Sequence, residues 1–384
     1  MQQKNNKFKK AEVITISFAH MAHDTFSSFL APLLPLLIEK LGINLSIVAL
    51  LDIIRRIPAL FNPFFGLIAE KRGVKYFVIL TPAITAISMS LIGLSTSVGM
   101  LLILLVVAGI SSALFHVPSP TMIKEASGER TGTGMSFFMV GGELARTIGP
   151  ILVTAGVSWW GLEGIYRLMP IGIIASIILY IKLKDFDTNR PISKPKEKGD
   201  AKRLLQKYSS FFTLIALFLL FQSGMKSALT LYLPVYLVSE GQSLWYAGIS
   251  LALLQFFGVI GTFASGSISD KIGRRETLLI ATIGSALFMG IFIYTGSIIS
   301  LAFLGLFLFA TGPVLMALVQ DTNSHMPTFM NSIYMSINFG ISSIVVFAVG
   351  FLGDTQGLAT TYLVFNIVAI GSVPIAFLLG HTKV

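Results

Sequence analysis

The sequence predicts an all-α membrane protein in which twelve transmembrane helices form two pseudo-symmetric six-helix bundles. Three observations support this prediction: the composition is apolar, twelve long apolar runs follow one another, and the second half repeats features of the first. Of the 384 residues, 54% are hydrophobic and only 12% are charged, whereas a soluble domain carries about 25% charged residues. So little charge cannot cover the surface of a soluble globule of this length.

Each apolar run is long enough for a helix to cross a bilayer, which takes about 20 residues. The runs lack the in-and-out alternation of barrel strands, so helices are expected. The first run contains His20, His23 and Asp24 and has no small-residue cleavage site, so it is interpreted as a retained helix rather than a signal peptide. The predicted spans are 12–38, 46–69, 76–95, 98–122, 132–157, 164–182, 209–238, 244–266, 277–295, 298–321, 329–351 and 357–380.

Lys and Arg are distributed unequally between the two sets of loops. Twelve spans put both termini on one side, and this side holds 22 Lys and Arg residues against two on the other, Lys40 and Arg167. Positive charge accumulates on the cytoplasmic side of a membrane protein. We therefore predict a multi-pass protein of the plasma (inner) membrane with both termini in the cytoplasm. The net charge of +10 is explained by this orientation, and no nucleic-acid partner is expected.

The long polar segment around residues 182–207 contains two prolines and divides the chain. We predict an N-terminal six-helix bundle over 1–184, a cytoplasmic linker over 185–208 and a C-terminal six-helix bundle over 209–384. A polybasic lipid-binding strip is the alternative interpretation of the linker, but four acidic residues dilute its charge. The expected partners are membrane lipids, a small solute and protons, and we expect a monomer.

Two features recur at nearly the same spacing in both halves. The loop from Gly66 to Gly73 is matched by the loop from Gly266 to Gly273, and a Pro/Gly pair seven residues apart ends both the first and the seventh span. Two repeats at one offset indicate duplication. Transporters built from parallel repeats rock two halves about a site near the membrane midplane.

The duplicated loop resembles the signature of the major facilitator superfamily, G-x-x-x-D-[RK]-x-G-[RK]-[RK]. The second copy fits fully, while the first has Glu70 for the Asp and Val74 for a basic residue. The resemblance implies a secondary transporter whose cytoplasmic loops hold one conformation shut; a purely topological role for the charges is the alternative. The predicted gating residues are Gly66, Glu70, Arg72, Gly73, Gly266, Asp270, Arg274 and Arg275.

Ionisable side chains in the middle of predicted spans are functional candidates, because lipid excludes charge. Four cations suit a carboxylate, phosphate or phosphonate group: Arg55, Arg56, Arg146 and Lys226. Four groups that exchange protons are candidates for proton coupling: His20, Asp24, His116 and Glu143. Polar and aromatic residues of the second half that would complete a substrate cavity are Gln222, Tyr232, Tyr236, Gln255 and Asn338.

A structural interpretation of the same residues remains open. Asp52 and Arg56 are spaced to pair along one helix, and so are Glu143 and Arg146. His116 would then be a packing residue between helices.

Residues 18–37 and 108–150 resemble the fosmidomycin-resistance branch of this superfamily, through a first helix of the form H-x-x-x-D followed by L-x-P-L-L-P-L-L, and through the segment containing Ser-Ala-Leu-Phe-His. The resemblance implies a plasma-membrane exporter driven by proton inflow, with phosphonate antibiotics among its cargo. It assigns His20, Asp24 and His116 to the site, and Gly149-Pro150 to a helix bend typical of antiporters. The chain departs from the branch at Val117 and Ala145, and Leu105 stands where the superfamily's antiporters carry an arginine.

We therefore predict a proton-coupled antiporter that exports a small anionic or amphiphilic compound, of the drug-efflux type. The alternatives are a proton-coupled importer of an organic anion, and a divalent-metal transporter that uses His20, His23, Asp24 and His116. No enzyme is expected, because nucleotide-binding, zinc-protease and nucleophile-elbow motifs are absent. With no Cys and five His, neither a resident metal nor a cofactor is expected.

Overall fold

The computed structural model describes residues 8–61, 75–128, 131–186, 200–322 and 327–379. These residues are almost entirely helical, and no strand occurs among them. Within these ranges, eleven helices are long and apolar enough to cross a membrane. They match eleven of the twelve predicted spans. The remaining span, 46–69, is described only as far as Phe61, so its second part lies outside the described residues.

The chain forms two compact units. Unit 1 comprises Met1–Ile43, Leu50–Ser193 and Gln242–Ala252, and unit 2 comprises Asn44–Ala49, Lys194–Gly241 and Leu253–Val384. The helices before residue 193 are α1 (Lys10–Ser27), α2 (Leu30–Leu41), α3 (Leu45–Arg56), η1 (Ile57–Phe61), α5 (Lys75–Leu91), η2 (Ile92–Leu94), α6 (Val98–His116), α7 (Ser119–Ser127), α8 (Thr131–Trp160), η4 (Glu163–Leu168) and α9 (Met169–Leu183).

The remaining helices are α10 (Asp200–Lys207), α11 (Ser209–Leu231), α12 (Leu233–Ser239), α13 (Leu244–Ile272), α14 (Arg274–Thr295), α15 (Ile298–Asp321), α16 (Pro327–Gln356), α17 (Leu358–Ile370) and α18 (Ser372–Leu379). Helix α10 lies inside the predicted linker. The first residues of α3 belong to unit 2, and the first residues of α13 belong to unit 1.

The first predicted helix, 12–38, is one span but not one continuous helix. Helix α1 ends at Ser27 and α2 begins at Leu30. Pro32 has no N–H to donate to the carbonyl one turn earlier, which weakens the backbone ladder at this point. The Phe29 N–H donates to the Phe26 carbonyl rather than to that of Thr25, and the Ser28 hydroxyl donates to the Thr25 carbonyl at 2.8 Å. Asp24 therefore lies in the last turn of α1.

A second interruption ends α6 at His116, six residues before the predicted end of that span. Pro118 cannot continue the hydrogen-bond ladder of α6, and the chain resumes as the short helix α7. His116 is consequently the last residue of its helix. Both α1 and α6 thus end near residues that the sequence singled out as site candidates.

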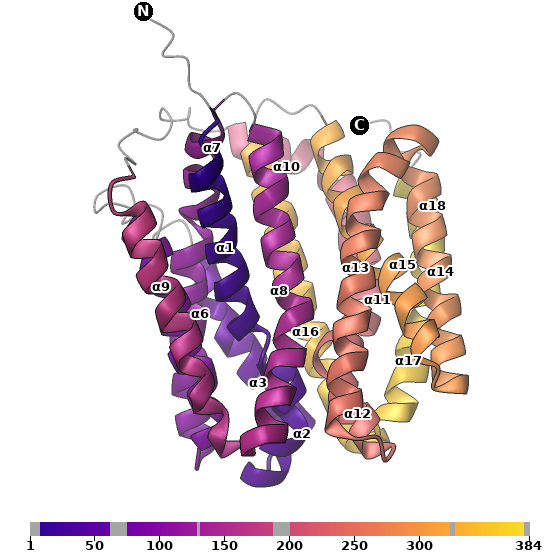
Figure 1. The fold of residues 1–384 in the computed structure, drawn as a ribbon. Coiled ribbons are helices and arrows are strands. Elements are labelled where there is room, and N and C mark those ends of the chain that lie inside the picture. Colours follow the sequence, from indigo (N-terminus) through magenta and orange to yellow (C-terminus); the bar gives the residue numbers. More distant parts are fainter. Residues whose placement is uncertain (1–7, 62–74, 129–130, 187–199, 323–326, 380–384) are drawn as a thin grey trace, which may run out of the picture. The chain divides into compact units, whose positions relative to one another are not determined.

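Unit 1 is organised around the contact of α1 with α8, which lie side by side (Figure 1). Val13 and Ile16 of α1, Phe115 of α6, Phe138 of α8 and Leu179 of α9 belong to one buried apolar cluster. Lipid tails are as apolar as these side chains, so in a bilayer the cluster stabilises the packing of the helices through close van der Waals contact. The ionisable residues of α1 lie next to this cluster.

Unit 2 packs α11 against α16 and α14 against α15. Its core includes Phe212, Ile215, Phe218, Val314 and Met330. One acidic residue serves as a helix cap within this unit: the Asp354 carboxylate accepts the backbone N–H groups of Leu45 at 2.7 Å and Ser46 at 2.9 Å. The N terminus of α3 is therefore held by a side chain from the last turn of α16.

Candidate functional site

Four ionisable residues of α1 and α6 form one cluster in unit 1, which we call the Asp24 cluster: His20, His23, Asp24 and His116. His20 Nε2 lies 3.3 Å from Asp24 Oδ2, and His116 Nε2 lies 3.3 Å from Asp24 Oδ1. His23 Nδ1 lies 2.9 Å from Asp24 Oδ1 and donates a hydrogen bond to it. Three imidazole rings therefore surround a single carboxylate.

The Asp24 cluster is buried except at one corner. The side chains of His20 and Asp24 are each 8% exposed, and that of His23 is fully buried. His116 differs, with 38% of its side chain exposed. A proton or another small cation would therefore reach Asp24 most directly past His116.

The position of the His20 side chain is determined by helical spacing on α1 and by contacts with α8. His20 and Asp24 are one turn apart on α1, so their side chains share a face. His20 Nδ1–H donates to the Phe138 carbonyl of α8 at 2.8 Å, which leaves Nε2 facing the carboxylate. A Cβ atom on Gly142 would lie only 2.4 Å from His20 Nε2. Glycine at this position therefore makes room for the imidazole against α8.

Aromatic rings enclose the imidazoles. His20 stacks on Phe138 with ring centroids 4.0 Å apart, and His23 stacks on Phe115 at 4.6 Å with an interplanar angle of 7°. These rings exclude water from two sides of the cluster. Electrostatic attraction within it is stronger than in water, because the surroundings are less polarisable.

The electrostatics of the Asp24 cluster favour a positive charge. A helix C terminus carries partial negative charge, and the cluster contains the last turn of α1, the end of α6 and a carboxylate. A nitrogen lone pair that faces a carboxylate oxygen at 3.3 Å is repelled unless a cation lies between them. That cation is either a proton on an imidazole or a metal ion.

Asp52, Arg55 and Arg56 form a second group in unit 1. Arg55 Nη2 lies 2.7 Å from Asp52 Oδ1, and Arg56 Nε lies 2.8 Å from Asp52 Oδ2. The Asp52 side chain is buried, while half of the Arg56 side chain is exposed. The two guanidinium groups therefore share one buried carboxylate, and Arg56 keeps donors available outside the pair.

Glu143 is not a member of the Asp24 cluster but pairs with Arg146 along α8. Arg146 Nη1 lies 3.0 Å and 3.1 Å from the two Glu143 carboxylate oxygens. The Arg146 side chain is 46% exposed, and that of Glu143 is 14% exposed. The pairing of Glu143 with Arg146 along one helix is the structural alternative that the sequence left open. It leaves part of the Arg146 side chain accessible.

The candidates of the second half have contacts within unit 2. Gln222 Nε2 donates to Ser372 Oγ at 3.1 Å, and Tyr232 donates its hydroxyl hydrogen to the Leu45 carbonyl at 3.0 Å. Four further candidates belong to the same half. Lys226 Nζ lies 5.1 Å from the Phe309 ring centroid, and Tyr236 stacks on Tyr362 at 4.4 Å. Gln255 and Asn338 are half-buried. Gln222 Oε1 is buried without a hydrogen-bond partner, so this amide retains an unused acceptor.

The first copy of the predicted gating loop, with Gly66, Glu70, Arg72 and Gly73, lies outside the described residues. The second copy forms a charged network at the turn between α13 and α14. Arg274 pairs with Asp270 and with Asp321, whose Oδ2 lies 3.0 Å from Arg274 Nε.

The other motif residues complete this turn. Gly273 has a φ of 104°, a backbone conformation that residues other than glycine rarely adopt. The Arg275 guanidinium lies 3.8 Å from the Phe377 ring centroid. Gly266 lies inside α13, where a Cβ atom would meet no neighbour within 4 Å.

Two contributors to the Asp24 cluster did not enter the predicted site, the Phe138 carbonyl and Gly142, and His23 entered only the alternative of a divalent-metal transporter. His23 had a visible signal, because it neighbours Asp24 in sequence and is itself ionisable. The Gly141-Gly142 pair inside a predicted helix was also a sign of close backbone approach. A backbone carbonyl carries no sequence signal, so the contact of Phe138 with His20 was not predictable.

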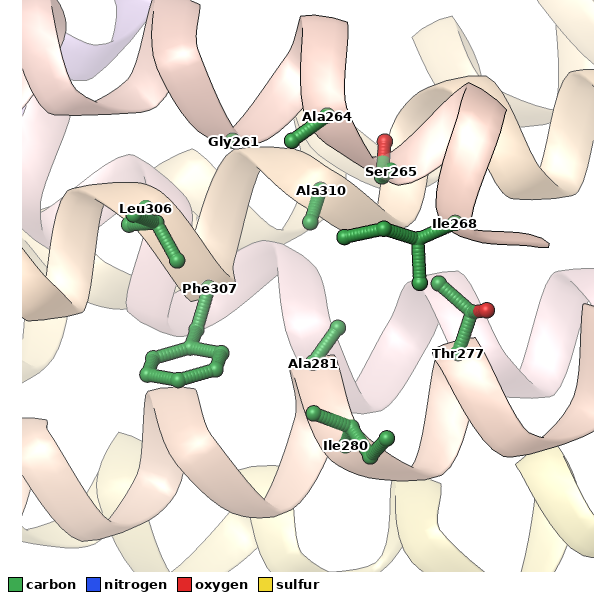
Figure 2. Close-up of a pocket in the computed structure, with 10 residues that line it drawn as sticks. All are labelled: Gly261, Ala264, Ser265, Ile268, Thr277, Ile280, Ala281, Leu306, Phe307 and Ala310. Atoms are coloured by element: carbon green, nitrogen blue, oxygen red, sulfur yellow. The ribbon is translucent and has the colours of Figure 1, made fainter. Parts of the chain in front are cut away.

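Unit 2 also contains a small cavity between α13, α14 and α15 (Figure 2). Its volume is about 70 Å³, whereas sites for drug-sized molecules measure roughly 300–1,000 Å³. Two hydroxyl groups, those of Ser265 and Thr277, are the polar side-chain groups in its lining. The cavity thus lacks both the size and the charge expected of a substrate site.

Known proteins resemble this chain over most of its length. Fosmidomycin resistance protein of Escherichia coli (strain K12) is 22% identical over 356 residues, which cover 90% of this chain and 87% of that protein. Multi-drug resistance efflux pump PmrA of Streptococcus pneumoniae is 25% identical over 351 residues, which cover 86% and 84%. A bacterial homologue of the human lysosomal transporter Spinster, solved in an inward-facing and unoccupied conformation, has a TM-score of 0.80 at 14% identity and covers 100% of this chain and 98% of its own.

The structural likeness confirms the predicted fold class, an all-α membrane protein with the major facilitator fold. The family model described as Major Facilitator Superfamily matches residues 16–346. That range includes the whole Asp24 cluster and the second gating loop. The chain therefore belongs to the major facilitator superfamily and is a membrane transporter rather than an enzyme.

Proposed function

We propose that this transporter is a proton-coupled antiporter that exports a small anionic or amphiphilic compound across the plasma membrane. The observation that carries the proposal is the Asp24 cluster, a buried carboxylate in contact with three imidazoles. A structural ion pair needs one cation, whereas three titratable rings around one carboxylate provide sites for proton exchange. The names of two relatives, a resistance protein and an efflux pump, support the direction of transport.

In the proposed cycle, a proton enters at His116, the exposed member of the cluster, and passes to Asp24. Uptake of the proton changes the charge of the cluster by one unit, and such a change shifts the balance between two conformations. The two predicted six-helix halves, 1–184 and 209–384, are the moving parts of this proposal. The proton leaves on the cytoplasmic side before cargo binds.

The proposed cargo contact is Arg146. Its side chain is 46% exposed, and its guanidinium pairs with Glu143. A phosphonate or carboxylate group offers the same pair of oxygens as Glu143 and can replace it. Arg56, half of whose side chain is exposed, is the proposed second contact.

The proposed orientation has both termini in the cytoplasm. Its support is the excess of Lys and Arg in one set of loops. We also propose that the transporter is a monomer, in which a single chain carries the whole Asp24 cluster on α1 and α6.

Transport by inside-out vesicles tests the function. A thermal-shift screen of small phosphonates, phosphates and carboxylates selects the cargo, with fosmidomycin included because of the relative's name. Vesicles with an acidic lumen should accumulate the selected cargo, and cargo addition should make the lumen more alkaline. Asp24→Asn should remove both signals while the protein still inserts in the membrane. His325→Gln, a change outside the cluster, is the matched control.

The opposite result has a defined meaning. Cargo that accumulates in right-side-out vesicles under an inward proton gradient would identify an importer. Normal flux in Asp24→Asn would remove Asp24 from the coupling mechanism.

A further inference from the structure

We propose that His20, Asp24 and His116 form a binding site for a divalent transition-metal ion, with Zn²⁺ as the best fit. One ligand atom from each residue can be chosen so that the three atoms lie within 4.8 Å of one another. Two imidazole nitrogens and one carboxylate oxygen are a common set of three protein ligands for zinc, with a fourth position open to water or another ligand.

The spacing of the ligand atoms suits a tetrahedral ion. Zinc bonds to nitrogen and oxygen of about 2.0–2.1 Å put neighbouring ligand atoms roughly 3.3–3.4 Å apart in a tetrahedron. His20 Nε2 lies 3.3 Å from Asp24 Oδ2, and His116 Nε2 lies 3.3 Å from Asp24 Oδ1. One carboxylate oxygen and the two nitrogens lie within 4.8 Å of one another, so the side chains need to close further to place all three ligand atoms around one ion.

Two ligands already have the outer contacts that hold metal ligands in place. The Phe138 carbonyl accepts Nδ1–H of His20, which leaves the Nε2 lone pair for the ion. His23 Nδ1–H donates to the Asp24 carboxylate and fixes its orientation. Such contacts to imidazole and carboxylate ligands are usual in protein metal sites and raise affinity.

The ligand types available in the chain favour some divalent metal ions over others. The chain contains no Cys, so no thiolate competes for the ion. Imidazole nitrogen suits Zn²⁺ and Co²⁺, whereas Mg²⁺ and Ca²⁺ prefer all-oxygen sites. The helix ends and the Asp24 carboxylate together supply the negative charge that a dication needs.

The inference rests on the geometry of the cluster and does not depend on the direction or the cargo proposed above. It does have a consequence for transport, because a metal ion and a proton occupy the same nitrogen lone pairs. Bound Zn²⁺ therefore competes with protons for the cluster, whether the ion is itself moved or only blocks the cycle.

Equilibrium metal binding to the full-length protein tests the inference without any transport. The protein is purified in detergent with a tag that contains no His, titrated calorimetrically with Zn²⁺, and examined with Co²⁺ by visible absorption. We expect one Zn²⁺ per chain and the intense visible bands of four-coordinate Co²⁺. His116→Gln and Asp24→Asn should each weaken Zn²⁺ binding by more than about 100-fold, since loss of an outer contact alone costs roughly 10- to 100-fold.

The control is the double variant His325→Gln/His381→Gln, which changes the two histidines outside the cluster and should bind Zn²⁺ as the wild type does. His20→Gln provides a third ligand variant in case one of the others does not fold, as judged by size-exclusion chromatography and circular dichroism. Wild-type-like affinity in folded ligand variants, or loss of binding in the control, would overturn the site. Intact metal binding with no cargo-driven proton movement would instead reject the export proposal alone.

Discussion

At the scale of single residues, Asp24 owes its surroundings to contacts made by three different helices. Its own helix supplies His20 and His23, α6 supplies His116, and α8 fixes His20 through a backbone carbonyl. Each imidazole has a different environment. His23 is fully buried, His20 bonds to α8, and His116 is partly exposed. The proposed exchange of a cation at the carboxylate therefore takes place through His116, while His20 and His23 hold the carboxylate in place.

A substitution at Gly142 tests whether the Asp24 cluster depends on close packing against α8 as well as on its ionisable groups. Gly142→Ala adds a methyl group that would lie 2.3 Å from a ring carbon of His20, so the imidazole must move away. We expect Zn²⁺ affinity to fall by about 10-fold, as for loss of an outer contact, and proton-coupled flux to fall with it. Calorimetry and vesicle flux measure these effects.

The control for this change is Gly312→Ala, because a Cβ atom at Gly312 would meet nothing within 4 Å. Equal effects of the two substitutions would mean that added helix propensity, and not displacement of His20, is responsible.

At the scale of helices, two interruptions position the candidate residues Asp24 and His116. Helix α1 ends beside Asp24 and α6 ends at His116, in both cases shortly before a proline. In an uninterrupted helix these carbonyls would accept hydrogen bonds from N–H groups one turn later. The helix would then carry no partial negative charge at these points. The two breaks thus contribute directly to the preference of the cluster for a cation.

The cap of α3 leads to a prediction for stability. Asp354 accepts two backbone N–H groups of α3 and the Ser46 hydroxyl at 2.5 Å. Asp354→Ala leaves these donors without their acceptor, and we expect the free energy of unfolding to fall by about 1–2 kcal/mol. Thermal unfolding in detergent measures the change. Glu39→Ala removes an exposed acid without such a contact and should change stability by less than about 0.5 kcal/mol.

The turn between α13 and α14 leads to a prediction for the transport cycle. Asp270→Asn weakens the pairing with Arg274, and the exposed pair contributes only about 0–1 kcal/mol to stability. We expect slower turnover with unchanged equilibrium affinity for cargo in the favoured state, because the loop is predicted to act on the change of conformation rather than on binding. Stopped-flow flux and equilibrium binding separate the two quantities. A large loss of affinity would show that Asp270 acts on the binding site instead.

At the scale of the whole molecule, the orientation in the membrane is the property that most needs a direct test. The chain contains no Cys, so a single introduced cysteine gives an unambiguous labelling signal. Ser193→Cys in the predicted linker should react with a membrane-impermeant maleimide only in inside-out vesicles, and Thr96→Cys only in intact cells. Labelling of both positions from the same side would contradict the predicted topology.

The same scale shows why the membrane spans were predictable. Hydropathy acts on each segment separately, because every backbone polar group in lipid must be paired within its own helix. Eleven spans therefore appear where the sequence places them. Span ends were less predictable, since Pro32 and Pro118 interrupt helices inside apolar runs without changing their hydropathy.

What the sequence determined by itself is local: the apolar spans, the family signature of the loops, and pairs one turn apart such as His20 with Asp24 and Glu143 with Arg146. Tertiary structure decided which of these groups meet. Packing of α1, α6 and α8 brings His116 to 3.3 Å from Asp24 and leaves Glu143 with Arg146. The physical reason is that hydropathy and helical spacing depend on neighbours along the chain, whereas the meeting of distant side chains depends on how closely whole helices approach.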